Sequence, residues 1–185
     1  MKKIIITIPS SILEKEINKD AFVRKTNYCN HYIYIVNYHN HPNTTMEIGR
    51  LRELSFRNAG GGTGKSYDLD EFDTREEAFY KQLIVWDPEE KKIIGGYRFI
   101  LGNDVISSSK YNNTATNNLF DFSTDFYSKT LGLTIELGRS FVQPEYQPSS
   151  GNRKAIFSLD NLWDGLGALV VDHPEIKYFF GKVTM

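Results

Sequence analysis

A glutamate and an arginine that share one apolar segment are the strongest candidates for chemistry in this 185-residue chain. Glu136 and Arg139 lie three residues apart in the run 134–146, whose β-branched and apolar pattern predicts a strand. Gly138 interrupts this strand, and an internal glycine often marks a bulge, which shifts the alternation of side chains between the two faces. We expect such a bulge to bring Glu136 and Arg139 into one cleft and to leave backbone N–H groups unpaired. The strand therefore predicts part of a ligand site.

A second group of charged residues lies earlier in the chain. The acidic run 67–73 contains Asp70 and Asp73. It is either a solvated loop or a set of carboxylates that hold a cationic substrate or pair with arginines such as Arg52 and Arg98. Because Arg98 lies within an apolar strand, it requires a partner if it is buried. A carboxylate paired with arginine stays ionised in a fixed orientation, so the run has either a solvating or a positioning role.

The polar segment 143–154 leads into an amphipathic helix expected from Ile156 onward. Unpaired N–H groups at a helix start attract anions, and Arg153 and Lys154 add positive charge beside it. This start is either an ordinary capped helix or a phosphate site. Because it follows the strand with the expected bulge, the combination favours binding of a phosphopantetheine arm.

Two further motifs have simpler explanations. The run 60–66 is similar to a phosphate-binding loop, but that motif requires a glycine where the chain has Ala59, and a preceding strand instead of a helix. We interpret it as a flexible hinge. His39 and His41 stand at strand spacing, yet the chain has one cysteine and no acidic ligand adjacent to them, so we interpret them as surface histidines and expect no metal site.

The composition is typical of one globular domain, with 40% apolar and 14% aromatic residues and a net charge of −1. The near-zero charge gives no reason to expect nucleic acid as a partner. A single cysteine excludes an internal disulfide and fits a reducing compartment. No apolar run approaches the roughly 18–20 residues of a membrane span. We therefore expect a cytoplasmic protein and leave peripheral membrane contact open.

The pattern of apolar residues predicts helices and strands in an α/β order. We predict strands at 4–8, 32–38, 82–86, 92–101, 134–143 and 177–183. We predict helices at 10–18, from a capping box at 44–47 to the glycines 60–62, and from Ile156 to just before Pro174, and a mobile polar loop at 107–118. The last strand–helix–strand unit is expected to be a parallel crossover.

Several short motifs follow one another along the chain. They are Arg52-x-x-x-Phe56, Asp70-x-x-Asp73, Arg98, Glu136-Leu-Gly-Arg139 with Phe141-Val142, and Leu162-Trp163-x-Gly165-Leu166. In this order, from about residue 47 to 183, they resemble the GNAT acyltransferase superfamily. The resemblance is closer to its N-acyl amino acid synthases, the ornithine-lipid and glycine-lipid N-acyltransferases often labelled hemolysin-like. Acyl-homoserine lactone synthases are more distant relatives.

The resemblance implies a GNAT-like mixed, twisted sheet flanked by helices, with a splayed or bulged central strand. We expect residues 1–185 to form a single acyltransferase-like domain, on which residues 1–43 pack as an N-terminal extension. Relatives usually continue beyond the last strand, so we leave open that the chain is a fragment with an incomplete acceptor side.

The resemblance also implies transfer of a fatty acyl group from acyl carrier protein to the α-amine of an amino acid such as glycine or ornithine. Glu136 is then the candidate base, acting directly or through water, with Arg139 beside it. Arg139 or Arg98 orients the acidic loop or holds the acceptor carboxylate. The substrate side is completed by Arg52, Phe56, Asp70 and Asp73.

The acyl donor is expected along the strand and the loop after it, and no cofactor is expected to be bound permanently. N–H groups near Ser140–Val142 would stabilise an oxyanion, and the donor residues are Ser140, Phe141, Val142, Asn152, Arg153 and Lys154. The usual pyrophosphate loop, Gln/Arg-x-x-Gly-x-Gly/Ala, is replaced by the longer segment 146–154. This departure favours a carrier-protein arm, which has one phosphate, over acyl-CoA. Acetyl-CoA-dependent acetylation of a small amine and a non-catalytic binding module remain the alternatives.

Overall fold

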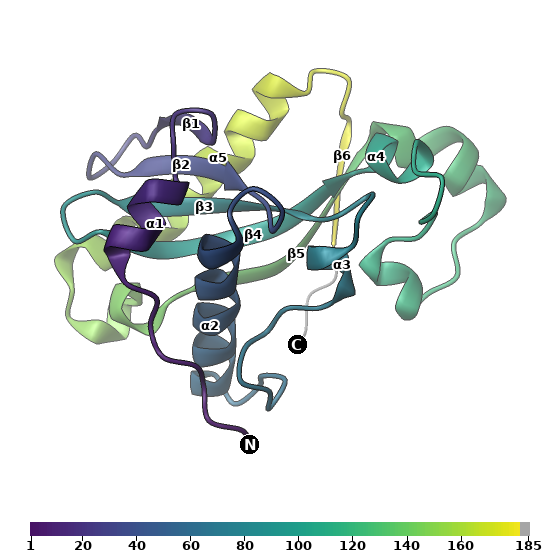
Figure 1. Ribbon diagram of the computed structural model, residues 1–185. Coiled ribbons are helices and arrows are strands. Elements are labelled where there is room, and N and C mark those ends of the chain that lie inside the picture. The colour runs from purple at the N-terminus through teal and green to yellow at the C-terminus, as the bar shows by residue number, and fades with distance from the viewer. Residues whose placement is uncertain (182–185) are drawn as a thin grey trace.

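The computed structural model describes residues 1–181, in which six strands follow one another in chain order across one sheet (Figure 1). They are β1 (Phe22–Lys25), β2 (Tyr32–Val36), β3 (Lys81–Asp87), β4 (Lys92–Leu101), β5 (Thr134–Val142) and β6 (Tyr178–Gly181). Neighbouring strands are antiparallel, except that β5 and β6 run parallel. The mixed sheet and the parallel crossover expected from the sequence are therefore confirmed.

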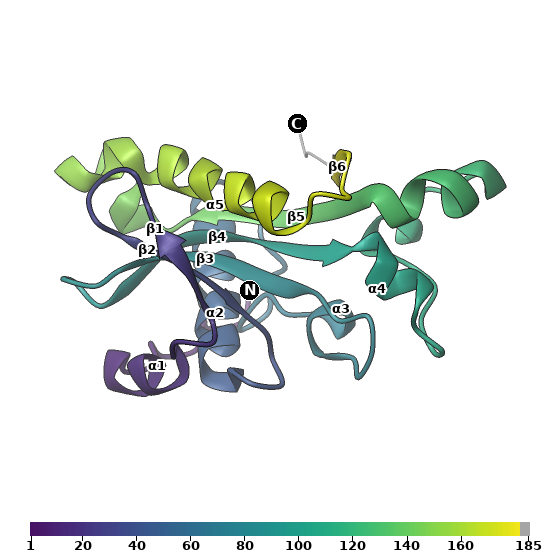
Figure 2. The same ribbon diagram turned by 90° about the horizontal axis from the view of Figure 1, so that it is seen from above.

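Helices cover the two faces of the sheet in separate groups. α1 (Ser10–Glu16), α2 (Pro42–Asn58) and the short α3 (Glu71–Thr74) lie on one face, and α5 (Ser158–Asp172) lies on the other (Figure 2). We call these the α2 face and the α5 face. The segment that begins with α4 (Gly102–Ile106) and includes the turns Ala115–Asn118, Phe126–Thr130 and Leu131–Leu133 extends beyond one end of the sheet. Three short turns, Pro144–Tyr146, Pro148–Ser150 and Arg153–Phe157, connect β5 to α5.

Apolar side chains form a separate core on each face. On the α5 face, Leu162, Leu166 and Leu169 recur at helical spacing and pack against strand residues that include Leu83 and Ile135. On the α2 face, the buried core contains Ile48, Leu51, Ile84, Trp86 and Phe141. A third group, under the segment beyond the sheet, contains Phe72, Tyr80, Ile100, Val105, Ala115 and Leu131. Side chains of strand β5 therefore contribute to the apolar cores on both faces of the sheet.

The central strand β5 contains a bulge at Arg139 and Ser140. Gly96 of β4 pairs with Phe141 and Arg98 pairs with Gly138, so β5 has two residues where β4 has one. The left-handed residue is Arg139, with φ of 51°, and not Gly138 as the sequence suggested. After the bulge the faces are exchanged, because Phe141 packs in the core of the α2 face and Val142 packs in that of the α5 face. The predicted bulge is confirmed, one residue later than expected.

Several local predictions differ from the structure. Residues 4–8 form no strand, and the Ile5 N–H donates to the Ser66 carbonyl instead, at 3.1 Å. The predicted capping box at 44–47 is wrong, because α2 already begins at Pro42, and the Thr44 N–H binds the Glu16 carboxylate at 2.8 Å.

The predictions for the two ends of the chain and for the segment beyond the sheet also differ in part from the structure. The expected mobile loop at 107–118 contains a buried stretch, Thr114 to Thr116. Residues 1–43, expected as an extension, supply β1 and β2 to the sheet itself. The predicted last strand begins as expected, and its residues 182 and 183 lie outside the described residues.

The glycine-rich loop after α2 is anchored and does not have the form of a hinge. The Glu53 carboxylate accepts hydrogen bonds from the Thr63 N–H at 2.9 Å, the Thr63 hydroxyl at 2.7 Å and the Gly64 N–H at 2.9 Å. Arg57 donates to the same carboxylate at 2.7 Å. Burial alone would raise the pKa of Glu53, but the hydrogen bonds from Thr63, Arg57 and Gly64 lower it to about 2.

We expect Glu53→Gln to lower the free energy of unfolding at pH 7 by about 1–3 kcal/mol, because hydrogen bonds to a charged group contribute roughly that much. Since the folded-state pKa is depressed, this contribution is complete above the ordinary pKa of 4.5 and is lost as the pH falls toward about 2. Urea unfolding of both proteins across this range measures the effect, with the exposed Glu90→Gln as control. A difference between Glu53→Gln and wild type that is the same at pH 7 and near pH 2 would contradict the prediction.

Candidate functional site

Strand β5 holds the Glu136 carboxylate on the α2 face, where three donors converge on one of its oxygens. Oε1 accepts from the Tyr80 hydroxyl at 2.8 Å, the Thr116 hydroxyl at 3.1 Å and the Thr116 N–H at 3.2 Å. Glu136 is only 5% exposed. Its second oxygen, Oε2, is buried and has no hydrogen-bond partner among the residues that the structure describes. Oε2 is therefore the atom of this group whose hydrogen-bonding capacity is unused within the described residues.

The orientation of Glu136 is fixed by a fully buried tyrosine. The Tyr80 hydroxyl donates to Glu136 and accepts from the Ala115 N–H at 2.8 Å. Burial, and then the charge of Glu136, raise the pKa of Tyr80 above its ordinary value, so its hydroxyl keeps the proton that it donates. The Tyr80 ring meets Phe72 edge-on, with 5.7 Å between centroids, and the Arg98 guanidinium lies 4.9 Å from its centre. The carboxylate is thus connected to the neighbouring arginines through Tyr80.

A buried ionic network lies beside this carboxylate and joins four elements. Asp73 of α3 lies between two guanidiniums: Arg52 Nη1 of α2 is 3.3 Å from Oδ1, and Arg98 Nη1 of β4 is 3.2 Å from Oδ2. Gln82 of β3 donates to Asp73 Oδ1 at 2.9 Å and accepts a hydrogen bond from Arg52. Arg98 Nη1 also lies 2.8 Å from both Asp70 oxygens. Burial alone would raise the pKa of Asp73, but Arg52 and Arg98 hold it below the ordinary value, so the carboxylate stays charged.

At the edge of the network, Arg139 is the guanidinium that reaches solvent, with its side chain 33% exposed. Its Nη2 lies 3.2 Å from Asp68 Oδ1 and 3.6 Å from Asp70 Oδ2. Burial raises the pKa of Asp68, against the opposing charges of Arg139 and Arg52. Asp68 Oδ2 and Arg139 Nε are buried without hydrogen-bond partners in the described part of the chain. The region around Arg139 and Asp68 therefore has a partly exposed positive charge and, within the described residues, two buried polar atoms without hydrogen-bond partners.

The structure brings most of the predicted catalytic and substrate residues to one face, but not all of them face a ligand. Glu136, Arg139, Asp70, Asp73 and Arg98 lie along the α2 face of β4, β5 and α3. Arg52 is completely enclosed, so it orients Asp73. Phe56 packs against the apolar core under α2. Sequence patterns did not mark Tyr80 or Thr116, because one adjoins a strand and the other lies in a low-complexity run.

Of the three β5 residues that we predicted to bind the acyl donor, two have side chains packed in a core, so they can offer a ligand only their backbone groups. Phe141 is buried on the α2 face and Val142 packs on the α5 face, whereas Ser140 is exposed. Strand β6 pairs with β5 only from Thr134 to Leu137 within residues 1–181. From Gly138 onward the regular pairing of β5 with β4 is interrupted by the bulge at Arg139 and Ser140, which agrees with the interrupted strand that the sequence predicted.

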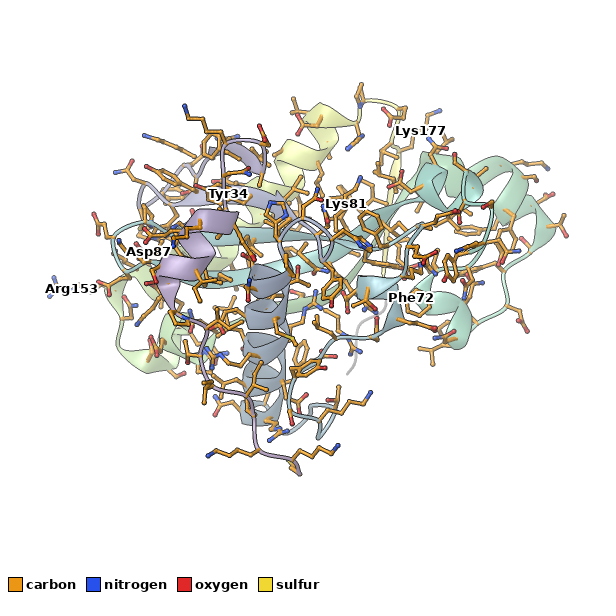
Figure 3. All side chains as sticks on the ribbon, viewed as in Figure 1. Tyr34, Phe72, Lys81, Asp87, Arg153 and Lys177 are labelled. Atoms are coloured by element: carbon orange, nitrogen blue, oxygen red, sulfur yellow. The ribbon has the colours of Figure 1, made fainter. Side chains whose placement is uncertain are left out.

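The loop residues that we predicted for phosphate lie at the other end of the sheet. In Figure 3, Arg153 projects into solvent near Asp87, on the opposite side from Phe72. Lys154 Nζ is bound 2.8 Å from Asp87 Oδ2 and 2.8 Å from Glu89 Oε2, and these contacts raise its pKa. Asn152 Oδ1 accepts from the Lys154 N–H at 2.9 Å. Of the two basic residues, Arg153 is exposed and Lys154 is half-buried.

Asp87 is the centre of a second buried polar cluster, which fixes the connection between β5 and α5. Its Oδ2 accepts from the Tyr146 hydroxyl at 3.0 Å and lies 3.5 Å from His31 Nε2. His31 Nδ1 is 3.0 Å from the Asn161 amide of α5. Burial lowers the pKa of His31, which keeps the ring neutral near pH 7. We therefore interpret the buried polar residues of this cluster as structural supports for the connection between β5 and α5.

The comparisons with known proteins agree with this geometry. Residues 51–155, more than half of the chain, match the family model described as an acetyltransferase (GNAT) domain. The chain belongs to the GNAT acetyltransferase family. The matched part of this GNAT chain runs from α2 to the turn before α5 and includes Glu136 and the whole ionic network. The resemblance to the GNAT superfamily that the ordered motifs suggested is therefore confirmed.

Two curated relatives are similar to the GNAT chain over its whole length. Both are named glycine N(alpha)-acyltransferase; the protein of Bacteroides thetaiotaomicron is 53% identical and that of Phocaeicola vulgatus is 50% identical. The chain covers 55% and 57% of these relatives, so it spans about half of their length. No solved structure matches the chain. Within residues 1–181, none of the helices has the length and apolar character needed to cross a membrane.

We expect Tyr80→Phe to lower the free energy of unfolding by about 1–3 kcal/mol, because it leaves the buried Ala115 N–H without an acceptor. Tyr146→Phe is a matched control, since it also removes a buried hydroxyl from a carboxylate, at the opposite end of the sheet. Amide hydrogen exchange should show lost protection at Ala115 and Thr116 in Tyr80→Phe only. Equal exchange at these two amides in both variants would show that Tyr80 does not hold the Thr114–Thr116 turn in place.

Proposed function

We propose that this GNAT domain transfers a fatty acyl group from a thioester carrier to the α-amine of an amino acid, with glycine as the first candidate. The single observation that carries the proposal is the Glu136 carboxylate, which is held by Tyr80 and Thr116 through Oε1 and presents a buried, unpartnered Oε2. The names of the two relatives support an amino acid acceptor. The ordered motifs support the N-acyl amino acid synthase branch of the family.

In the proposed reaction, Glu136 acts as a general base. An amino acid at neutral pH carries an ammonium group, which is not nucleophilic, and Oε2 accepts one of its protons. The amine nitrogen then attacks the thioester carbonyl, and a second proton of the amine passes to solvent. As the C–S bond breaks, Glu136 returns its proton to the sulfur, which leaves as a thiol. Tyr80 and Thr116 keep the carboxylate in place during both transfers.

The bulged part of β5 suits the arm that carries the thioester. From Glu136 to Val142 the strand extends over roughly 20 Å, a length comparable to an extended phosphopantetheine arm. Backbone N–H groups at the bulge would stabilise the oxyanion that forms when the amine attacks. An arm that lies along this part of β5, with its phosphate toward the loop 143–157, places the thioester near Glu136.

The charge of the loop after β5 favours acyl carrier protein over acyl-CoA. Coenzyme A has a pyrophosphate and a further phosphate, which require several positive groups. Lys154 is already paired with Asp87 and Glu89, and Arg153 is the exposed cation beside it. A carrier-protein arm needs only one phosphate contact. Comparison of turnover with acyl carrier protein and acetyl-CoA separates this proposal from the acetylation of a small amine.

On the acceptor side, Arg139 is the best candidate to bind the amino acid carboxylate. It is the guanidinium of the ionic network that reaches solvent, and it lies on the same face as Glu136. Arg52, Asp70, Asp73 and Arg98 would hold it in position without contacting the acceptor.

Glu136→Gln keeps the shape of the side chain but removes the base, so we expect transfer from palmitoyl carrier protein to glycine to fall by about 10²-fold or more. Mass spectrometry of the N-acyl glycine product measures it. Glu47→Gln is the control, because Glu47 is another buried carboxylate that binds Arg50 away from the site. Turnover that stays within about threefold of wild type in Glu136→Gln would exclude Glu136 as the base. Binding of the acyl carrier protein with no turnover on any thioester would instead identify a non-catalytic module.

A further inference from the structure

A cluster of aromatic rings lies where β6 meets the segment beyond the end of the sheet. The Phe122 and Phe126 rings are stacked with centroids 4.5 Å apart, and Phe180 of β6 lies 5.5 Å from Phe122 and 6.0 Å from Phe126. We call these three residues the aromatic cluster. All three are only half-buried. They therefore form an apolar surface that the rest of the described chain does not cover completely.

The aromatic cluster begins directly beside Glu136. Phe180 is the residue of β6 that pairs with Glu136 of β5, so the two side chains project from the same face of the sheet on neighbouring strands. Phe126 packs against the apolar group that contains Tyr80 and Ala115, the residues bound to one another above the carboxylate. The cluster is thus continuous with the proposed reaction site.

Further exposed apolar side chains lie in the same segment. Tyr127, whose ring centroid is 6.2 Å from that of Phe122, is 38% exposed, and Leu119 and Phe120 are 60% and 59% exposed. Apolar surface left in water is unfavourable, and apolar patches on a protein surface often mark a binding site. The segment projects past the sheet as a unit (Figure 2), which places this surface at the end of β5 where Thr134 lies.

We propose that the aromatic cluster receives the hydrocarbon chain of the acyl donor and sets its length preference; this inference rests on the proposed function. The thioester carbon has to lie near Glu136, and the pantetheine arm approaches along β5 from the side of Val142. The acyl chain must then leave in the other direction, toward Thr134 and β6. The aromatic cluster is the apolar surface that begins at this point.

The energies of the groups involved favour entry of a chain between the rings. Separation of one stacked ring pair is a fixed cost that does not depend on the length of the incoming chain. The gain from burial of methylene groups grows with each carbon of the chain, so a long chain offsets that cost. An acetyl group gains almost nothing from the same surface. The cluster therefore selects long chains over acetyl.

Phe122 is the residue of choice for the test. Phe126 also packs against the buried core with Phe72 and Val105, so its removal affects folding, whereas Phe122 is not part of that core. Phe22 provides a matched control. It is a half-exposed ring in edge contact with Tyr32 and Tyr34 on β1 and β2, at the opposite edge of the sheet.

The experiment compares kcat/KM for acetyl, octanoyl and palmitoyl donors in wild type, Phe122→Ala, Phe122→Trp and Phe22→Ala. We expect Phe122→Ala to lower kcat/KM for the palmitoyl donor by about tenfold or more, with the acetyl donor unchanged, because a lost apolar contact of this size costs roughly that factor. Phe122→Trp, which adds volume to the same cluster, should shift the preference from palmitoyl toward octanoyl. Phe22→Ala should keep the wild-type order of donors.

Calorimetric binding of the same donors provides a readout that does not depend on turnover. If wild type turns over no donor but binds the palmitoyl donor more tightly than the acetyl donor, and Phe122→Ala removes that difference, the chain site stands while the proposed catalysis fails. If wild type turns over palmitoyl donors and both Phe122 variants keep the donor preference of Phe22→Ala, the aromatic cluster is packing alone and the inference is overturned.

Discussion

The bulge in β5 is the constraint on which the rest of the site depends. In a regular strand Glu136 and Arg139 would lie on opposite faces, and Arg139 would point into the apolar core under α5. An unpaired guanidinium in such a core costs several kcal/mol. One extra residue at the bulge instead turns Arg139 toward Asp68 and returns Val142 to the α5 face. The left-handed conformation at Arg139 therefore makes the base and the ionic network neighbours.

The buried network positions the site more than it stabilises the fold. A buried ion pair recovers little free energy beyond the desolvation of its charges, but the loss of one partner is costly, because the other charge then remains buried without compensation. Asp73 is held by Arg52 and Arg98 from different elements, and Gln82 and the Asp70 N–H also donate to it. These bonds fix α2, α3, β3 and β4 relative to one another, so that Arg139 has a rigid support.

The sequence predicted those parts of the site that local patterns encode. Glu136 and Arg139 stand in one strand, and the glycine between them indicated a bulge. Tyr80 and Thr116 have no such pattern, because their role comes only from contacts to Glu136 across 56 and 20 residues of chain. Lys154 met the expectation of a cation at a helix start, but its partner Asp87 lies 67 residues away and binds it instead. The role of Lys154 therefore depends on a contact with a residue distant in sequence, which the charge pattern around it does not reveal.

Strand β5 loses regular pairing with β4 at the bulge, which gives the proposed reaction its place. The bulge disrupts this pairing between Gly138 and Phe141. On the other side, β6 pairs with β5 from Thr134 to Leu137, a stretch that includes Glu136. Polar backbone groups require partners, so unpaired N–H groups at this point favour an incoming carbonyl or oxyanion. The same point separates the bulged part of β5, suited to a polar arm, from the aromatic cluster, suited to a hydrocarbon chain, and Glu136 lies at the boundary between them.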